Sequence, residues 1–189
     1  LNETCKDYLR RMQSAAVRMS QFIQGILEYS RITTSSKPFE NVDLNDVLKD
    51  VLTDLDVKIN QLKVVIKSST LPTIKADKLQ MYQLFLNLLS NAIKFHQQGI
   101  APQIQIDFNK VSKNQLEISF KDNGIGFEEK YIEKIFAPFQ RLHSRQEYEG
   151  TGIGLTACDR IVRRHRGEIR VQSKLGEGSC FIVCLPTSS

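Results

Sequence analysis

The first thirty residues carry a heptad pattern, which limits the possible folds more than any other feature of the chain. Apolar side chains recur at alternating steps of four and three residues, at Tyr8, Met12, Ala15, Met19, Phe22, Ile26 and Tyr29. This spacing is typical of a helix that packs against other helices along a seam. Leu9, Ala16 and Ile23 widen the stripe, which favours more than one partner helix. We therefore expect a helix from about Glu3 to Ile32 that enters a helix bundle; packing on the chain's own domain is the alternative.

A polar linker separates this helix from a region with a different pattern. Residues 33–38 read Thr-Thr-Ser-Ser-Lys-Pro, which predicts a break. Asp43 and Asp77 then stand directly before helical patterns, where an aspartate caps free backbone N–H groups. We expect helices over about 44–59, 77–95 and 153–165, a helical turn over 132–135, an extended piece at 39–43, and strands over 64–66, 103–108, 116–120, 168–172 and 180–185. These segments predict mixed α and β structure with about five strands.

The bulk composition limits the partners. With 41% hydrophobic residues, the chain can bury a core without help from a metal or a disulfide. Its net charge of +5 favours an anionic partner. Arg163, Arg164, Arg166 and Arg170 cluster without interleaved aromatic residues, so we expect a solvated face and no nucleic-acid partner. No apolar run approaches the roughly 18 residues of a membrane span, and we expect membrane attachment only through an upstream segment of a longer parent protein.

The four cysteines indicate free thiols. Cys5, Cys158, Cys180 and Cys184 lack the paired spacing of a zinc site. Cys180 and Cys184 fall in one predicted strand, where four steps separate them by roughly 13 Å, beyond the ~7 Å limit for a disulfide. Reduced thiols are typical of the cytoplasm, and we expect the chain there, whether or not its parent is anchored in the inner membrane.

Two glycine clusters are candidates for ligand contact. Residues 122–127 (Asp-Asn-Gly-Ile-Gly-Phe) directly follow a predicted strand, and residues 150–155 (Gly-Thr-Gly-Ile-Gly-Leu) directly precede a predicted helix. Glycine lets backbone approach a ligand closely, and the start of a helix suits phosphate. A simple glycine-rich turn is the alternative for each cluster. The second cluster lacks the spacing of a Rossmann fingerprint and the Gly-Lys-Ser/Thr of a P-loop.

Polar side chains lie along one face of the predicted helix 77–95. Asn87 and Asn91 are four residues apart, and Lys94 is three further on. Amide oxygens can ligate Mg²⁺ and an ammonium group suits phosphate, although a solvated face would show the same pattern. Residues 136–141 (Phe-Ala-Pro-Phe-Gln-Arg) form a further motif, which taken alone could be a hydrophobic anchor.

In their order and spacing, these four segments resemble the boxes of sensor histidine kinases. Residues 87–95 resemble the N box, 122–126 the G1 box, 136–141 the F box and 150–155 the G2 box. The resemblance implies the Bergerat ATP-binding fold of the GHKL superfamily, an α+β sandwich in which a mixed sheet of about five strands carries about three helices on one face, preceded by one long helix. It also implies two parts: residues 1–36 as the second helix of the dimerisation and phosphotransfer hairpin with a linker, and residues 37–189 as the catalytic ATP-binding domain.

The resemblance implies which residues bind ATP. Asp122 would accept a hydrogen bond from the adenine amino group, and Phe95 would line the adenine pocket. The stretch 142–149 would be a mobile ATP lid. The other residues expected to contact the nucleotide are Gly124, Gly126, Phe136, Gly150, Thr151, Gly152, Ile153, Gly154 and Leu155.

The resemblance also assigns the phosphate end of the site. Asn91 would ligate Mg²⁺ with Asn87 close by, while Lys94 would meet the phosphates and Arg141 the terminal phosphate. ATPases of the superfamily carry a water-activating glutamate at the position of Asn87. Because an amide is not a general base, the resemblance favours phosphoryl transfer over hydrolysis, with catalysis by positioning and electrostatics.

The three histidines are not suited to accept the phosphoryl group. His96, His143 and His165 all follow Asn87, and we expect all three at the surface. In histidine kinases the phosphorylated histidine lies on the first helix of the hairpin, so we expect the acceptor upstream of Leu1.

We therefore expect the catalytic portion of a two-component sensor histidine kinase. It would transfer the γ-phosphoryl group of ATP to an upstream histidine, for relay to an aspartate of a response-regulator receiver domain. Its partners would be ATP, Mg²⁺, the receiver domain, and its own phosphotransfer helix bundle within a homodimer of the parent protein. A hydrolytic ATPase of the same superfamily and a degenerate, non-catalytic binding module are the alternatives.

Overall fold

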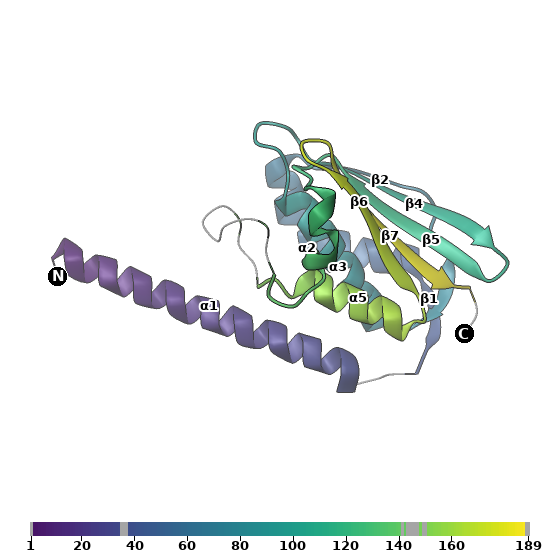
Figure 1. Cartoon of the computed structure of the whole chain (residues 1–189), viewed down its shortest axis with the longest axis horizontal. Helices are drawn as coiled ribbons and strands as arrows, with labels where there is room; N and C mark the ends of the chain where they lie inside the picture. Colours follow the sequence, from purple (N-terminus) through teal and green to yellow (C-terminus); the bar gives the residue numbers. More distant parts are fainter. Residues whose placement is uncertain (1, 35–37, 141, 143–147, 149–150, 188–189) are drawn as a thin grey trace.

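A five-stranded sheet with helices on one face forms the body of the chain (Figure 1). The computed structural model describes residues 2–34, 38–140, 142, 148 and 151–187. In spatial order the strands are β2 (Val65–Ser68), β4 (Gln103–Ser112), β5 (Gln115–Asp122), β7 (Gly178–Pro186) and β6 (Glu168–Lys174). Strand β2 runs parallel to β4, and the other neighbours are antiparallel. The predicted fold class, a mixed sheet of about five strands, is confirmed.

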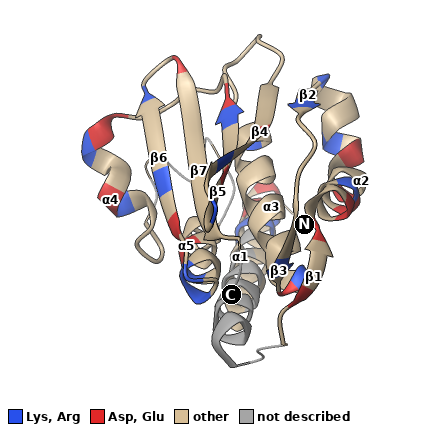
Figure 2. Cartoon of the chain, turned by 90° about the vertical axis from the view of Figure 1, so that its right-hand side faces the viewer, with Lys and Arg blue, Asp and Glu red and all other residues tan. Residues whose placement is uncertain are grey.

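Three helices cover one face of this sheet: α2 (Leu44–Leu62), α3 (Lys78–Lys94) and α5 (Gly154–Arg164). In Figure 2 the sheet lies in front of α3 and α5, so the view is onto its other face. The predicted caps are present: Asp43 accepts a hydrogen bond from the N–H of Asn45 (2.8 Å), and Asp77 accepts one from the N–H of Gln80 (3.3 Å). Each cap satisfies a backbone donor that a helix start leaves without a partner.

The core lies between the sheet and the helices. Because side chains alternate across a strand, Leu116, Ile118 and Phe120 of β5 all face the helices and are buried. Phe120 meets Phe85 of α3 edge to face, with ring centroids 5.0 Å apart. This contact anchors α3 on the centre of the sheet and so sets the position of the polar side chains further along the helix.

A second, two-stranded sheet joins the start of α2 to the start of α3. Strand β1 (Glu40–Asp43) pairs with β3 (Thr73–Ala76) in antiparallel fashion. The extended piece expected at 39–43 is therefore confirmed, while β3 was not predicted. The short elements η1 (Glu129–Tyr131) and α4 (Ile132–Ile135) precede the F-box segment.

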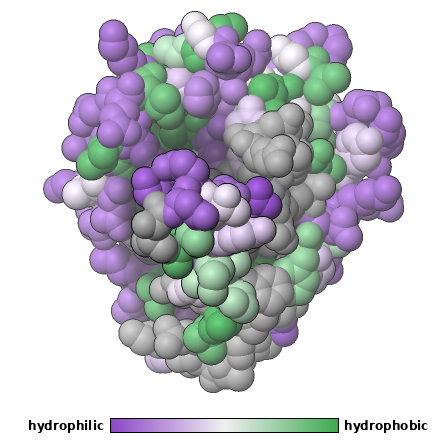
Figure 3. Space-filling model, turned by 90° about the vertical axis from the view of Figure 1, so that its left-hand side faces the viewer, coloured by the Kyte–Doolittle hydropathy of each residue, from purple (hydrophilic) through white to green (hydrophobic). Residues whose placement is uncertain are grey.

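Helix α1 (Glu3–Thr34) extends away from the sheet and contacts α5 (Figure 1). Among its described side chains, the exposed large apolar ones are Tyr8, Leu9, Met12, Val17, Met19, Ile23 and Leu27. Figure 3 views the molecule from the side on which the N-terminus of α1 lies, and apolar and polar side chains are mixed on this face. The predicted bundle stays a prediction, since one chain leaves these side chains exposed. In the described parts of the chain, no helix is both long and apolar enough to span a membrane.

Candidate functional site

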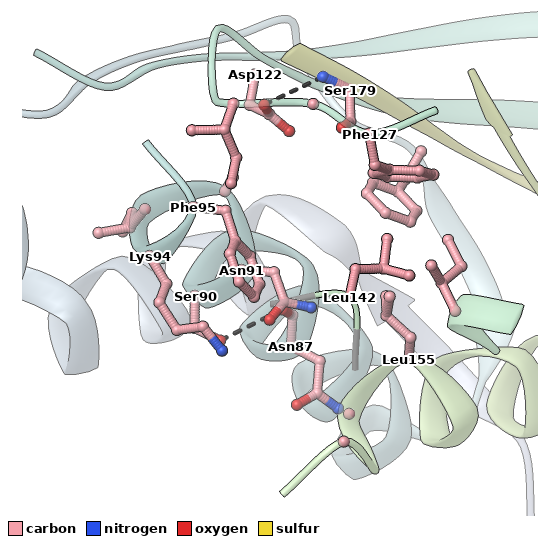
Figure 4. Close-up of a pocket in the computed structure, with 18 of the residues that line it drawn as sticks. Asn87, Ser90, Asn91, Lys94, Phe95, Asp122, Phe127, Leu142, Leu155 and Ser179 are labelled. Carbon is pink, nitrogen blue, oxygen red and sulfur yellow. Dashed lines mark hydrogen bonds between the residues drawn. The ribbon is translucent and has the colours of Figure 1, made fainter. Parts of the chain in front are cut away.

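A cavity of about 370 Å³ opens between α3, the loop after β5, and the start of α5 (Figure 4). It brings together segments that are far apart in the sequence. The residues expected to bind nucleotide that line it are Asn87, Asn91, Lys94, Phe95, Asp122, Gly126, Thr151, Gly152, Gly154 and Leu155. Gly124, Phe136 and Ile153 are described but do not line the cavity. Arg141 and Gly150 lie outside the described residues, as does most of the expected lid.

One face of α3 supplies the polar wall of the cavity. Asn87, Asn91 and Lys94 project from successive turns, as Figure 4 shows. The Lys94 ammonium lies 4.1 Å from the centroid of the Phe95 ring, and this ring lies 4.9 Å from the ring of Tyr148. Amide oxygens and a cation next to an aromatic ring therefore share this wall.

Asp122 lies opposite, at the end of β5. Its Oδ1 atom accepts hydrogen bonds from the N–H groups of Gly124 (2.8 Å) and Ser179 (3.1 Å), and the second of these is drawn in Figure 4. Among the described residues, none donates to Oδ2. Burial raises the pKa of this carboxyl group, and the two backbone hydrogen bonds oppose the rise. The side chain thus points one oriented oxygen into a half-buried pocket.

Glycine is required in the loop that follows. Gly126 has φ of +58°, and a Cβ atom there would lie 2.1 Å from the carbonyl oxygen of Lys174. A Cβ on Gly124 would lie 2.5 Å from the carbonyl oxygen of Phe95. These contacts let the loop pass tightly between the end of α3 and the β6–β7 turn.

The start of α5 closes the cavity. Gly152 has φ of +75° and accepts a hydrogen bond from the N–H of Phe139 (3.0 Å), which ties the G2-box segment to the F-box segment. Ile153 is the N-cap of α5 and makes no side-chain capping bond. Among the described residues, no side chain caps this helix start, which lies next to Asn87, so its first N–H groups can meet an anionic ligand.

Several lining residues were not predicted from the sequence. They are Lys58, Ser90, Ala92, Ile93, Ile125, Phe127, Ile135, Gln140, Ser179 and Phe181, while Leu142 belongs to the expected lid. Ser90 could have been found, since it lies three residues after Asn87 on the same helix face. Ser179 could not, because only the pairing of β5 with β7 brings it to Asp122.

Two predictions about surface residues were wrong. His165 was expected at the surface, but it is buried: its Nε2 accepts a hydrogen bond from the N–H of Asp77 (3.2 Å), and its Nδ1 lies 2.8 Å from the carbonyl oxygen of Ile161. Arg164 was expected in a solvated arginine cluster, but it is half-buried and forms an ion pair with Asp77 (3.0 Å). Both side chains are used to join the end of α5 to the start of α3. His96 is only partly buried, and His143 lies outside the described residues.

The thiols give the site no nucleophile. All four cysteines are free, as predicted, and none of them lines the cavity. Cys158 is fully buried on α5, and burial raises the pKa of its thiol.

Comparison with known proteins identifies the kind of domain. A family model described as "Histidine kinase-, DNA gyrase B-, and HSP90-like ATPase" matches residues 76–189. Cyanobacterial phytochrome A of Nostoc sp. is 40% identical over 168 residues, which is 89% of this chain and 22% of that protein. Phytochrome-like protein Cph1 of Synechocystis sp. is 34% identical over 98% of this chain and 25% of its own length. The chain therefore spans about a quarter of these relatives or less.

Solved structures share the fold. The catalytic domain of histidine kinase ThkA superposes with a TM-score of 0.67 and 25% identity, over 81% of this chain and 100% of that one. Histidine kinase AdeS of Acinetobacter baumannii has a TM-score of 0.73 at 20% identity and covers the whole of this chain and 87% of its own, which shows the fold alone.

Proposed function

This chain belongs to the family of histidine kinase-, DNA gyrase B- and HSP90-like ATPases, and we propose that it is the ATP-binding catalytic portion of a sensor histidine kinase. One observation carries the proposal. One cavity has the carboxylate of Asp122 at the end where a nucleobase would lie, and the amides of α3 with the start of α5 at Gly154 at the other end. An adenine nucleotide offers an amino group for the first and phosphates for the second.

The ends of the nucleotide are assigned from these groups. The free oxygen of Asp122 accepts a hydrogen bond from the adenine amino group, and Phe95 packs beside the base. Lys94 contacts the phosphates, and the backbone of residues 151–155 approaches them, as phosphate at a helix start requires. Arg141 is assigned to the terminal phosphate on the family resemblance only.

The cavity fits Mg²⁺ that arrives with the nucleotide. Asn87 and Asn91 place amide groups on the wall where the phosphates would lie. No group of three His, Cys, Asp or Glu side chains forms a metal cage in the described residues. Mg²⁺ commonly takes few protein ligands together with phosphate oxygens and waters, so Asn91, with Asn87 near, would hold it in this way. The bound ion would neutralise charge on the transferred group.

The reaction we propose is transfer of the γ-phosphoryl group to a histidine outside this chain. His165 is buried with both ring nitrogens engaged, so it cannot reach the cavity. Asn87 stands where hydrolytic relatives need a base, and its amide cannot activate water. Positioning of ATP against a separate acceptor is what the residues on α3 can do.

We assign residues 1–36 to the second helix of a dimerisation and phosphotransfer hairpin with its linker, and residues 37–189 to the catalytic domain. The exposed apolar side chains of α1 support a helix bundle as its partner. A solved structure of histidine kinase ThkA holds the response regulator protein TrrA, and we propose a receiver domain as the next phosphoryl acceptor here. Four free cysteines suit a cytoplasmic location.

Incubation of the chain with γ-labelled ATP and Mg²⁺ tests this function. We expect no acid-labile label on the chain and no steady release of phosphate above background. Addition of the dimerisation and phosphotransfer hairpin that carries the acceptor histidine would then yield acid-labile label on that hairpin. Steady phosphate release would instead support the hydrolytic ATPase, and label on the chain alone would contradict an external acceptor.

A further inference from the structure

Gln97 lies just beyond α3, in a segment that none of the sequence motifs covers. Its side-chain nitrogen Nε2 is within hydrogen-bond distance of three backbone carbonyl oxygens: Asn123 (3.1 Å), Gly124 (3.1 Å) and Gly176 (3.0 Å). Two of these belong to the loop after Asp122, and the third belongs to the β6–β7 turn. One amide group therefore joins its own segment, which follows α3, to the loop after Asp122 and to the β6–β7 turn.

The chemistry of this contact is demanding. An amide nitrogen has two hydrogens, so three acceptors use its full donor capacity, and two of the three must share one hydrogen. The orientation of the amide is determined, because its oxygen would repel all three carbonyls if the group were turned over. Without a donor, the three carbonyl dipoles would converge on one point in a partly buried space, which is unfavourable.

The segments that Gln97 joins form the end of the cavity where the adenine base would bind. The N–H of Ile125 donates to the carbonyl oxygen of Phe95 (2.9 Å), and the N–H of Gly176 donates to the carbonyl oxygen of Ile125 (2.7 Å). Ser179, which follows the turn, donates to Asp122. The position of the Asp122 carboxylate relative to Phe95 thus depends on how the loop and the turn are held together.

We propose that Gln97 is a positioning residue for purine selection: its amide holds the loop of residues 122–126 against the β6–β7 turn so that Asp122 meets an adenine and rejects a guanine. The inference rests on the proposed function. Adenine offers an amino group to the carboxylate, whereas guanine has a carbonyl oxygen at the same place, which the carboxylate repels. Gln97 does not line the cavity and acts only through Asp122.

The test is equilibrium binding of ATP and of GTP to the full chain and its variants by calorimetry. Gln97→Met keeps the length of the side chain and removes the donors; Gln98→Met, at the exposed neighbouring residue, is the matched control. We expect Gln97→Met to weaken ATP binding about tenfold and to change GTP binding much less, so that the ratio of the two affinities falls. Gln98→Met should keep the ratio of the wild-type chain.

A rescue variant separates positioning from simple loss of stability. Gln97→Lys offers three N–H donors to the three carbonyls, and we expect it to restore the ATP-to-GTP ratio to within about threefold of wild type. The ratio is insensitive to partial unfolding, since an unfolded chain binds neither nucleotide. If Gln97→Met does not fold, Gln97→Asn replaces it, because the shorter amide cannot reach all three oxygens and the same ratio must fall.

The outcomes are distinguishable. A wild-type ratio in Gln97→Met or Gln97→Asn, with ATP bound normally, would overturn the role of Gln97 and leave the proposed function standing. Absence of adenine nucleotide binding by the wild-type chain would overturn the proposed function, and this inference with it.

Discussion

Asp122 is held by backbone donors from two distant places in the chain. Gly124 lies two residues further on, while Ser179 comes from β7, 57 residues away. Both donate to the same oxygen, Oδ1, and this leaves Oδ2 directed to the cavity. The orientation of one carboxylate therefore depends on the loop glycines and on the pairing of β5 with β7.

Replacement of Asp122 by Asn tests the recognition of the base. The amide oxygen can still accept both backbone hydrogen bonds, but the NH₂ group then faces the adenine amino group, and two donors meet. We expect ATP affinity to fall by about ten- to a hundredfold, the effect of losing a hydrogen bond to a charged group, with little change in melting temperature. Calorimetry and thermal unfolding of the variant check both parts. Unchanged ATP affinity would rule out the adenine assignment.

The site residues that could be predicted from the sequence are those that local spacing alone brings together. Asn87, Asn91 and Lys94 lie on one helix, where spacing alone places them on one face. Ser179 and Phe181 reach the cavity only through the sheet, and Lys58 only through the packing of α2 on α3, which local spacing cannot reveal. His165 was misplaced because a polar side chain at a helix end is ordinarily solvated, and its burial depends on Asp77, far earlier in the chain.

At the scale of elements, the end of α5 is joined to the start of α3 and to the segment that follows α1. His165 accepts from Asp77, and the Phe39 ring stacks on the imidazole with centroids 4.5 Å apart. The Arg164 guanidinium pairs with Asp77 and lies 5.3 Å from the centre of the Phe39 ring. This cluster lets α3 and α5, which both line the cavity, keep a fixed relation to each other and to Phe39.

The same cluster predicts a dependence of stability on pH. Burial lowers the pKa of His165, and the nearby Arg164 lowers it further, while the Ile161 carbonyl and Asp77 act in the opposite sense. The unfolded chain then binds a proton more readily than the folded chain, so stability is lost as the pH falls below about 6.5, the ordinary value for histidine. One such group changes the free energy of unfolding by at most about 1.4 kcal/mol per pH unit.

Urea unfolding between pH 5 and pH 8 measures this effect, with pH values chosen to span about 6.5. We expect His165→Gln to be less stable than wild type at high pH and to lose less stability as the pH falls. Equal slopes for wild type and His165→Gln would show that His165 does not titrate on unfolding.

The elements themselves were largely predictable from periodicity and caps. Strand β3 was missed because it is four residues long and gains its pairing from β1, more than thirty residues earlier in the chain. The periodic pattern of α1 predicted a helix that packs along one face. It did not identify the partner, because a heptad pattern is the same whichever helices the face packs against.

At the scale of the molecule, strand order and helix placement create the cavity. The order β2-β4-β5-β7-β6 puts Asp122 and Ser179 on neighbouring central strands, directly above α3. Periodicity cannot give this order, because strands β6 and β7 follow α5 in sequence but β7 inserts beside β5. The position of the site is thus a property of the whole sheet, although most of its polar residues were visible in the sequence.

Titration of the ¹⁵N-labelled chain with Mg-ATP, followed by NMR, tests whether one adenine nucleotide binds with Mg²⁺ in this cavity. We predict one saturable site, with the largest shifts at the amides of Asn91, Gly126, Gly152 and Ser179 and none beyond background in the groove between α2 and residues 68–70. An absence of saturable shifts, or shifts that centre on that groove, would show that the cavity is not the nucleotide site.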